Sequence, residues 1–100
     1  MDKYIVKLLS KAYFDLDNIY TYVSEFLLEP ETAQKLIDSL EEVIFSLEQL
    51  PKRGSLRKTG VYAGKGYRQL FFKNFTIVYR INEEQKQVLI ITVRYSKSQF

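Results

Sequence analysis

Residues 67–81 read YRQLFFKNFTIVYRI, and this stretch determines the architecture of the chain. Apolar and polar side chains alternate on both sides of Lys73 and Asn74, which is typical of strands that present one face to a core. An asparagine between two such runs favours a tight turn. The pattern therefore predicts two antiparallel strands, 67–72 and 75–81, joined by a hairpin.

Two further strands are predicted on either side of this hairpin. A second turn at 82–86 leads into the alternating run 87–95, which completes an antiparallel meander. Near the N-terminus, the β-rich apolar run 4–9 predicts a buried first strand that joins the same sheet. The segment 51–66 contains all four glycines and is expected to be a loop.

Two amphipathic helices are predicted between the first strand and that loop. Ser10 is expected to cap the first helix, whose apolar residues recur every three or four positions as far as Leu27. Pro30 separates the helices and Pro51 ends the second, so they should form an antiparallel hairpin. Aromatic residues of the first helix are expected to lie mostly in the core, and any outside its apolar face would mark a contact with another protein. They are Tyr13, Phe14, Tyr20, Tyr22 and Phe26.

The predicted order is β-α-α-β-β-β in a single domain, residues 1–100. This is an α+β fold in which the helical hairpin packs on one face of a mainly antiparallel four-stranded sheet. The opposite sheet face should be open, partly polar and basic.

Composition excludes several kinds of chemistry. The chain has no cysteine and no histidine, which removes disulfides, thiol nucleophiles, zinc-finger-type sites and Ser-His-Asp arrangements. We expect no cofactor and no metal. No apolar run reaches the length of a membrane span and no signal-peptide pattern is present, so we expect a cytoplasmic protein without a membrane partner.

Charge is distributed unevenly along the chain. Residues 1–50 carry four Lys or Arg against ten Asp or Glu, a net −6, whereas residues 51–100 carry eleven against two, a net +9. The simple alternative is ordinary solvation of a protein surface. An imbalance of this size favours one basic functional surface that meets a polyanion or an acidic partner.

The ordered set of motifs resembles a known family. It comprises Ala12-x-x-Asp15-Leu16-x-x-Ile19-x-x-Tyr22, Leu47-x-x-Leu50-Pro51-x-x-Gly54, Tyr67-Arg68-x-Leu70, FTIVYRI at 75–81 and Val88-x-Ile90-x-x-Val93. Over residues 3–95 this succession resembles the RelE/ParE toxin superfamily, and within it the ParE, or plasmid-stabilisation, branch of type II toxin–antitoxin systems. The resemblance implies a growth-arresting toxin and a cognate antitoxin that neutralises it by direct binding, often through an acidic, disordered segment. It also implies that operator DNA is bound only through the antitoxin.

The superfamily implies two mechanisms. ParE-like members act on DNA gyrase, and RelE-like members cut messenger RNA on the ribosome. RelE-like ribonucleases typically have an arginine where this chain has Thr76, and without histidine the proton transfers would fall to other groups. Gyrase inhibition is therefore favoured, the ribosome-dependent endoribonuclease is the alternative, and whether the chain is an enzyme stays open. A third hypothesis is an inactive toxin-fold module that only binds antitoxin.

Two sets of candidate site residues follow. A ribonuclease would draw on Arg68, Arg80, Arg94, Tyr95 and Lys97, provided that the tail folds over the sheet. Binding of a target would use Arg68, at a basic position found in both branches, together with the basic loop residues Arg53, Arg57, Lys58 and Lys65. Each of these side chains has a simple alternative role as a solvated surface charge.

Overall fold

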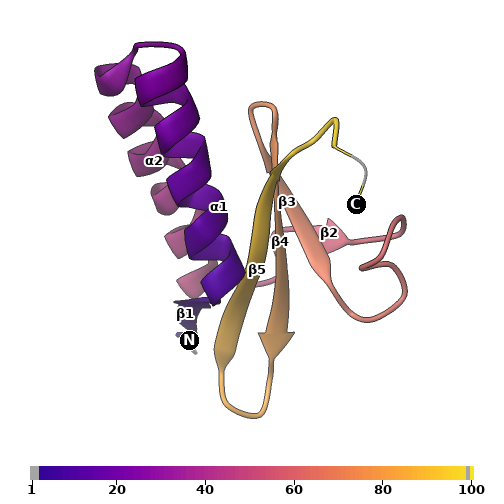
Figure 1. Cartoon of the computed structure of the whole chain (residues 1–100). Coiled ribbons are helices and arrows are strands. Elements are labelled where there is room, and N and C mark those ends of the chain that lie inside the picture. The colour runs from indigo at the N-terminus through magenta and orange to yellow at the C-terminus, as the bar shows by residue number, and fades with distance from the viewer. Residues whose placement is uncertain (1–2, 99) are drawn as a thin grey trace.

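The computed structural model describes residues 3–98 and 100. Two helices lie side by side along one face of a five-stranded sheet (Figure 1). The elements are β1 Ile5–Leu8, α1 Ser10–Thr21, a π-helical turn Tyr22–Phe26, α2 Pro30–Phe45, a 3-10 turn Ser46–Glu48, β2 Ser55–Leu56, β3 Arg68–Phe72, β4 Phe75–Asn82 and β5 Gln87–Tyr95. The predicted α+β class and the order of its elements are confirmed.

The strand order in the sheet is β1-β5-β4-β3-β2. β1 pairs with β5 in parallel, whereas all other neighbours are antiparallel. The sheet has one strand more than predicted, because Ser55 and Leu56 form a short edge strand inside the segment expected to be loop. Two residues between glycines show no alternation from which a strand could be predicted.

The first strand is an edge strand, and the prediction that it is buried is wrong. Ile5 is 65% exposed, and side chains along β1 alternate between exposed and half-buried. An edge strand has a neighbour on one side only, so a run of apolar residues does not ensure its burial. Tyr4, just before β1, is the buried member of the run.

The starts of the two helices follow different rules. Leu9 is the N-cap of α1, and its carbonyl accepts hydrogen bonds from the N–H groups of Ala12 and Tyr13. Ser10 is the first helical residue and not the cap, so that prediction is wrong. Pro30, expected to separate the helices, stands in the first turn of α2, where the missing N–H of proline costs nothing.

The core lies between the helices and one face of the sheet. Phe75, Ile77 and Tyr79 of β4 point toward Leu40 and Ile44 of α2, and all five are at most 3% exposed. Further core residues come from α1, the 3-10 turn and the neighbouring strands, namely Ala12, Leu16, Ile19, Leu47, Leu70, Val88, Ile90 and Val93.

The sheet face away from the helices, called here the outer face, is less open than predicted. Thr76 and Val78 of β4 lie on it, yet they are 1% and 0% exposed. The segment after β5 returns along this end of the sheet, where Ser96 Oγ lies 2.8 Å from Thr76 Oγ1 and the Ser96 N–H donates to Asn74 O. Figure 1 shows this segment passing over toward β2.

Most aromatic residues of the first helix are exposed, so the prediction that they lie mostly in the core is wrong. Tyr13, Phe14, Tyr22 and Phe26 are between 46% and 80% exposed, and Tyr20 is half-buried. The buried positions of the helices include the small residues Ala12 and Ala33, whereas most of the aromatic rings lie on the solvent-exposed surface. Within the part of the chain described, no helix is both long and apolar enough to span a membrane.

Candidate functional site

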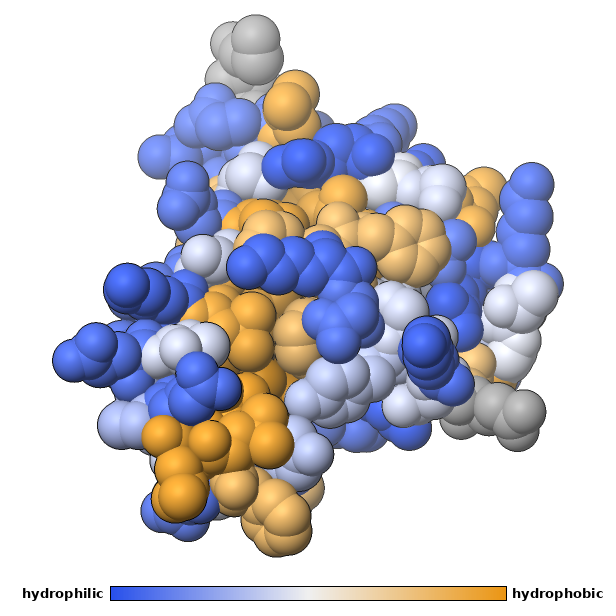
Figure 2. All heavy atoms as spheres, turned by 90° about the horizontal axis from the view of Figure 1, so that it is seen from above, coloured by the Kyte–Doolittle hydropathy of each residue, from blue (hydrophilic) through white to orange (hydrophobic). Residues whose placement is uncertain are grey.

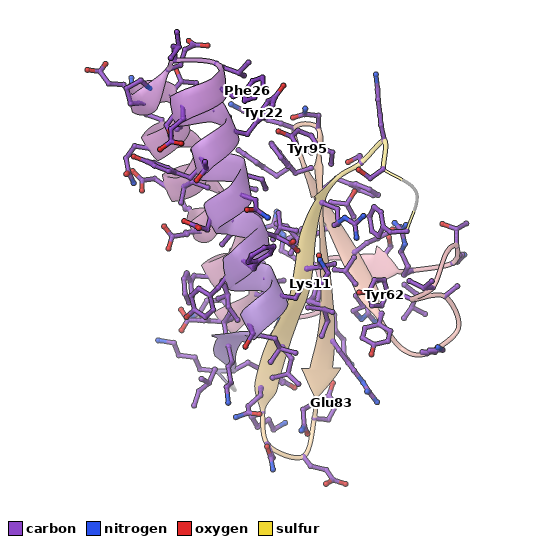
Figure 3. All side chains as sticks on the ribbon, in the orientation of Figure 1. Lys11, Tyr22, Phe26, Tyr62, Glu83 and Tyr95 are labelled. Atoms are coloured by element: carbon purple, nitrogen blue, oxygen red, sulfur yellow. The ribbon has the colours of Figure 1, made fainter. Side chains whose placement is uncertain are left out.

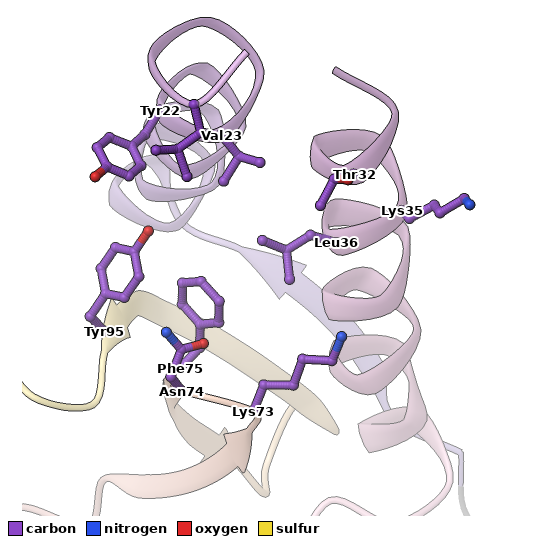
Figure 4. Close-up of a pocket in the computed structure, with 10 residues that line it drawn as sticks. Tyr22, Val23, Thr32, Lys35, Leu36, Lys73, Asn74, Phe75 and Tyr95 are labelled. Atoms are coloured by element: carbon purple, nitrogen blue, oxygen red, sulfur yellow. The ribbon is translucent and has the colours of Figure 1, made fainter. Parts of the chain in front are cut away.

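The helical hairpin and the sheet enclose an apolar cavity at the end where α1 meets α2. The cavity has a volume of about 570 Å³. Tyr22 and Val23 lie on the helix side, and Phe75 and Tyr95 lie on the sheet side (Figure 4). With Leu27 and Leu36, these residues line the cavity, which we call the apolar wedge because it lies in the angle between the helices and the sheet. Such a cavity suits an apolar side chain of a bound protein.

The surface around the wedge extends its apolar character. Phe26 and Leu28 are each 80% exposed at the tip of the hairpin, and the Phe26 ring stacks on Tyr22 at 5.5 Å between centroids. Figure 2 looks down on this end of the molecule and shows apolar side chains gathered in a broad band. An exposed apolar patch of this kind, bordered by polar groups, is typical of a protein-binding surface.

Two tyrosines face each other across the wedge. Their hydroxyl groups point toward one another in Figure 4, Tyr22 from the π-helical turn and Tyr95 from the end of β5. The Tyr95 ring contacts Phe75 at 4.7 Å between centroids. Burial, and to a smaller extent the nearby Tyr22 hydroxyl, raise the pKa of Tyr95. Tyr95 is therefore neutral at physiological pH and able to donate a hydrogen bond.

The rim of the wedge is basic. Lys35 of α2 and Lys73 of the β3–β4 turn both line the cavity, and both side chains are exposed. The Lys73 ammonium lies 5.6 Å from the centroid of the Phe72 ring. An apolar cleft with two ammonium groups at its mouth complements a segment that carries both apolar and acidic residues.

Arginines and aromatic rings alternate on the outer face. The Arg80 guanidinium lies 5.7 Å from the centroid of Tyr67, and Tyr67 contacts Tyr62 edge to face at 5.1 Å. Arg57 and Arg94 both lie over the ring of Phe100. In Figure 3, Tyr62 lies beyond β3, on the far side of the sheet from Lys11 on α1.

The loop after the second helix is fixed from inside the protein. Tyr79 is completely buried, and its hydroxyl donates to Pro51 O at 2.7 Å and accepts from the Gly54 N–H at 3.0 Å. Arg68 Nη1 donates to Gly54 O at 2.7 Å. Burial is the main reason that the pKa of Tyr79 is raised. Arg68 therefore stabilises a loop, and this contact occupies part of its guanidinium.

Two other basic residues of this loop also have partners. Arg53 Nη1 donates to Ser46 Oγ at 2.6 Å, and Lys52 Nζ lies 3.9 Å from a Glu83 carboxylate oxygen. Glu83, in the β4–β5 turn at the bottom of Figure 3, also accepts a hydrogen bond from the Tyr4 hydroxyl at 2.7 Å.

The residues predicted for catalysis do not lie together. Arg68 pairs with Tyr79 and Tyr95 pairs with Phe75, which places both on the helix side of the sheet and at opposite ends of it. Arg80 and Arg94 lie on the outer face, and Lys97 is exposed in the segment after β5.

The predicted target-binding residues divide into two groups. Arg53 and Arg68 lie beside the end of α2, whereas Arg57, Lys58 and Lys65 belong to the segment that borders the outer face. Lys58 and Lys65 are exposed, and Arg57 is half-buried. The wedge was not predicted from the sequence. Its one signal was the run of apolar residues from Phe26 to Leu28, just before Glu29 and Pro30, where a turn would normally be polar.

Among the described residues, no group of three or more Asp and Glu side chains is arranged to hold a metal ion. The two candidate functional surfaces are the apolar wedge and the arginine-rich outer face.

The sequence identifies the family. Residues 6–100 match the family model described as "ParE toxin of type II toxin-antitoxin system, parDE". The chain belongs to this family of type II toxin–antitoxin toxins. No curated protein sequence matches the chain significantly.

Solved structures share the fold. A chain from the chromosomal ParDE system of P. aeruginosa is 27% identical, with 95% of this chain and 98% of that chain covered and a TM-score of 0.78. The toxin–antitoxin complex RelBE2 from Mycobacterium tuberculosis matches at 22% identity, with 93% and 98% covered and a TM-score of 0.69. The free E. coli toxin RelE, as a double arginine mutant, matches at 13% identity, with 95% and 85% covered and a TM-score of 0.64.

Proposed function

We propose that this ParE-family toxin arrests growth by binding and inhibiting DNA gyrase and that it has no ribonuclease activity. The observation that carries the proposal is the separation of the candidate acid–base groups. Arg68 and Tyr95 lie on the helix side of the sheet, whereas Arg80 and Arg94 lie on the outer face. Cleavage of RNA by its own 2′-hydroxyl needs proton transfer and charge stabilisation at one phosphate, so these groups would have to converge.

Binding to a large target needs a charged surface and no catalytic centre. The exposed Lys58 and Lys65 belong to the same basic loop as Arg57, between β2 and β3. Unlike Arg53 and Arg68, whose guanidinium groups hold the loop 51–54, these two lysines extend into solvent. We therefore assign target contact to Lys58 and Lys65 in preference to Arg68.

The test is a DNA supercoiling assay with purified gyrase, run beside a ribosome-programmed messenger RNA cleavage assay. We expect inhibition of supercoiling and intact messenger RNA. The double variant Lys58→Glu/Lys65→Glu should lose most of the inhibition, whereas Lys7→Glu, an exposed lysine on the edge strand β1, should retain it. Cleaved messenger RNA with normal supercoiling would overturn the proposal. Folded protein without either effect would instead favour a module that only binds antitoxin.

We further propose that the cognate antitoxin silences the toxin by inserting an apolar and acidic segment into the wedge. The support is the shape and charge of this surface, with exposed Phe26 and Leu28 beside the cavity and lysines at its mouth. Solved relatives of the fold include toxin–antitoxin complexes of M. tuberculosis and E. coli.

Matched variants test the antitoxin surface by calorimetric titration. Phe26→Asp should weaken antitoxin binding strongly, because it places a carboxylate on the apolar patch. Tyr13→Asp alters an exposed aromatic residue near the start of α1, at the other end of the helix from Phe26, and should bind normally. Equal weakening by both variants, or by neither, would place the antitoxin elsewhere.

A further inference from the structure

One aromatic side chain covers two arginines on the outer face. The guanidinium carbon of Arg57 lies 4.3 Å from the centroid of the Phe100 ring, and that of Arg94 lies 4.9 Å from it. Both distances are within the range of cation–π attraction. Among the described residues, neither arginine lies within ion-pair distance of a side-chain carboxylate. The ring therefore stands where an anion would otherwise be attracted by two positive charges.

Arg57 is held in place for this contact by all three of its nitrogen atoms. Its Nε donates to Thr59 O at 3.1 Å, its Nη1 donates to Gln69 Oε1 at 2.8 Å, and its Nη2 donates to Phe100 O at 3.0 Å. A guanidinium fixed in this way loses little further entropy when a ligand binds. Phe100 contacts Arg57 in two ways. Its ring lies against the face of the guanidinium group, and its backbone oxygen accepts a hydrogen bond from Nη2.

The loop beside Arg57 is shaped to receive Phe100. Gly60 has a φ of +77°, and a Cβ at this position would overlap the carbonyl carbon and oxygen of Phe100. Gly64, in the same loop, has a similar φ of +72°, but a Cβ there would meet no atom within 4 Å. Two features therefore favour glycine at position 60, the positive φ of its backbone and the close approach of Phe100. At position 64 only the positive φ favours glycine.

We propose that Phe100 is an autoinhibitory cover over an anion-binding pair formed by Arg57 and Arg94. While Phe100 is docked, its ring lies against both guanidinium groups and its backbone oxygen accepts a hydrogen bond from Arg57. When Phe100 leaves, two guanidinium groups without carboxylate partners, one of them fixed by Thr59 and Gln69, face solvent and bind a polyanion. The basic surface proposed for target binding would then gain an anion-binding site only after Phe100 has left, whatever the target is.

The test measures binding of inorganic polyphosphate to the full chain at low ionic strength. Removing the ring by Phe100→Ala should tighten binding by roughly threefold or more, because its cation–π contacts no longer compete for the two guanidinium groups. Gly60→Ala should tighten binding at least as much, because a Cβ at this position displaces the backbone of Phe100 and so also removes its hydrogen bond to Arg57. Gly64→Ala is the matched control, since it introduces the same backbone strain and should bind like the parent chain.

The double variant Gly60→Ala/Phe100→Ala separates eviction from an unrelated loop effect. It should bind no more tightly than Gly60→Ala, because that substitution has already displaced both the ring and the backbone oxygen of Phe100. Titration of the parent chain, followed by NMR, should shift the Phe100 ring resonances as polyphosphate displaces it. Equal affinity of all variants, weaker binding by Phe100→Ala, or polyphosphate binding that leaves the Phe100 resonances unmoved would each overturn the proposal.

These readouts are independent of gyrase. A chain that fails to inhibit supercoiling while its polyphosphate affinity responds to Phe100 would contradict the proposed function and leave the cover intact. The reverse combination would contradict the cover alone.

Discussion

The Asp15 carboxylate on α1 takes the place of a strand neighbour for Thr92 in β5. It accepts a hydrogen bond from the Thr92 hydroxyl and a second one, at 3.1 Å, from the Val93 N–H. β1 pairs with β5 only as far as Ile90, so the edge of β5 beyond that point has no strand beside it. The Asp15 side chain thus accepts a backbone hydrogen bond from β5 just beyond the point where β1 ends and the chain enters α1.

Removal of this carboxylate should destabilise the fold. Asp15→Ala leaves a buried N–H and a buried hydroxyl without acceptors, which costs on the order of 1–3 kcal/mol in the free energy of unfolding. Urea denaturation measures the change. The exposed Asp17 on the same helix is the control, and Asp17→Ala should change stability by less than about 0.5 kcal/mol. Equal effects of the two substitutions would contradict the role of Asp15.

The ion pair of Asp15 with Lys11 should matter much less. Lys11 Nζ lies 3.1 Å from Asp15 Oδ1, and the Lys11 side chain is 48% exposed. Lys11→Ala should therefore cost no more than about 0.5 kcal/mol, as is usual for solvent-exposed pairs one helical turn apart. Denaturation at low and at high salt would show whether even this contribution is electrostatic, since screening should remove it.

Tyr79→Phe should loosen the loop 51–54. The substitution deletes a hydroxyl that donates to Pro51 O and accepts from the Gly54 N–H. We expect a loss of roughly 1–3 kcal/mol in the free energy of unfolding and faster amide exchange at Gly54. Tyr67→Phe is the control, because the Tyr67 hydroxyl has no hydrogen-bond partner among the described residues. An unchanged exchange rate at Gly54 would show that Tyr79 does not hold the loop.

Stability should fall as the pH rises above about 10. The pKa values of Tyr79 and Tyr95 are both raised above 10.0 in the folded chain, chiefly by burial. Between the unfolded and folded pKa values, the unfolded state releases the phenol proton first, so alkali favours unfolding. The contribution is complete below the unfolded pKa. Tyr79→Phe/Tyr95→Phe should lose stability less steeply than the parent chain in denaturation curves recorded between about pH 8 and 11.

Truncation of a core leucine should lower the free energy of unfolding far more than truncation of a leucine at the tip of the helical hairpin. Leu40 is completely buried, and Leu40→Ala should cost about 2–5 kcal/mol in the free energy of unfolding. Leu28 is 80% exposed, and Leu28→Ala should cost less than about 0.5 kcal/mol. Leu28→Ala should nevertheless weaken antitoxin binding. A large loss of stability on truncating Leu28 would mean that the tip is part of the core.

The sequence predicted the parts of the fold that follow local periodicity. The meander from Arg68 to Tyr95 and the helical hairpin are confirmed, because alternation and helical spacing directly report which side of an element is buried. The short strand at Ser55 and the edge position of β1 were not predicted. Both depend on pairing with residues far away in the sequence, and no local pattern encodes which neighbours a strand will have.

The candidate surfaces were predictable only in part. The basic character of the second half was evident, but the face on which each arginine lies depends on register, which places Arg68 with Tyr79 and Arg94 with Thr76. Exposure of the ring at Phe26 could not be predicted either. It follows from the π-helical turn Tyr22–Phe26, which changes the helical spacing at the end of α1.

The pairing of β1 with β5 also determines how late in synthesis the fold can be completed. Val6 lies beside Val88, so the first strand, at the edge of the sheet, pairs with the last strand of the meander. Contacts between residues so far apart in sequence form late, after the intervening loops have been closed. During synthesis, the sheet therefore stays incomplete until the residues of β5 have emerged from the ribosome. The folded ParE-family toxin therefore forms only after Gln87–Tyr95, the partner strand of β1, has been synthesised.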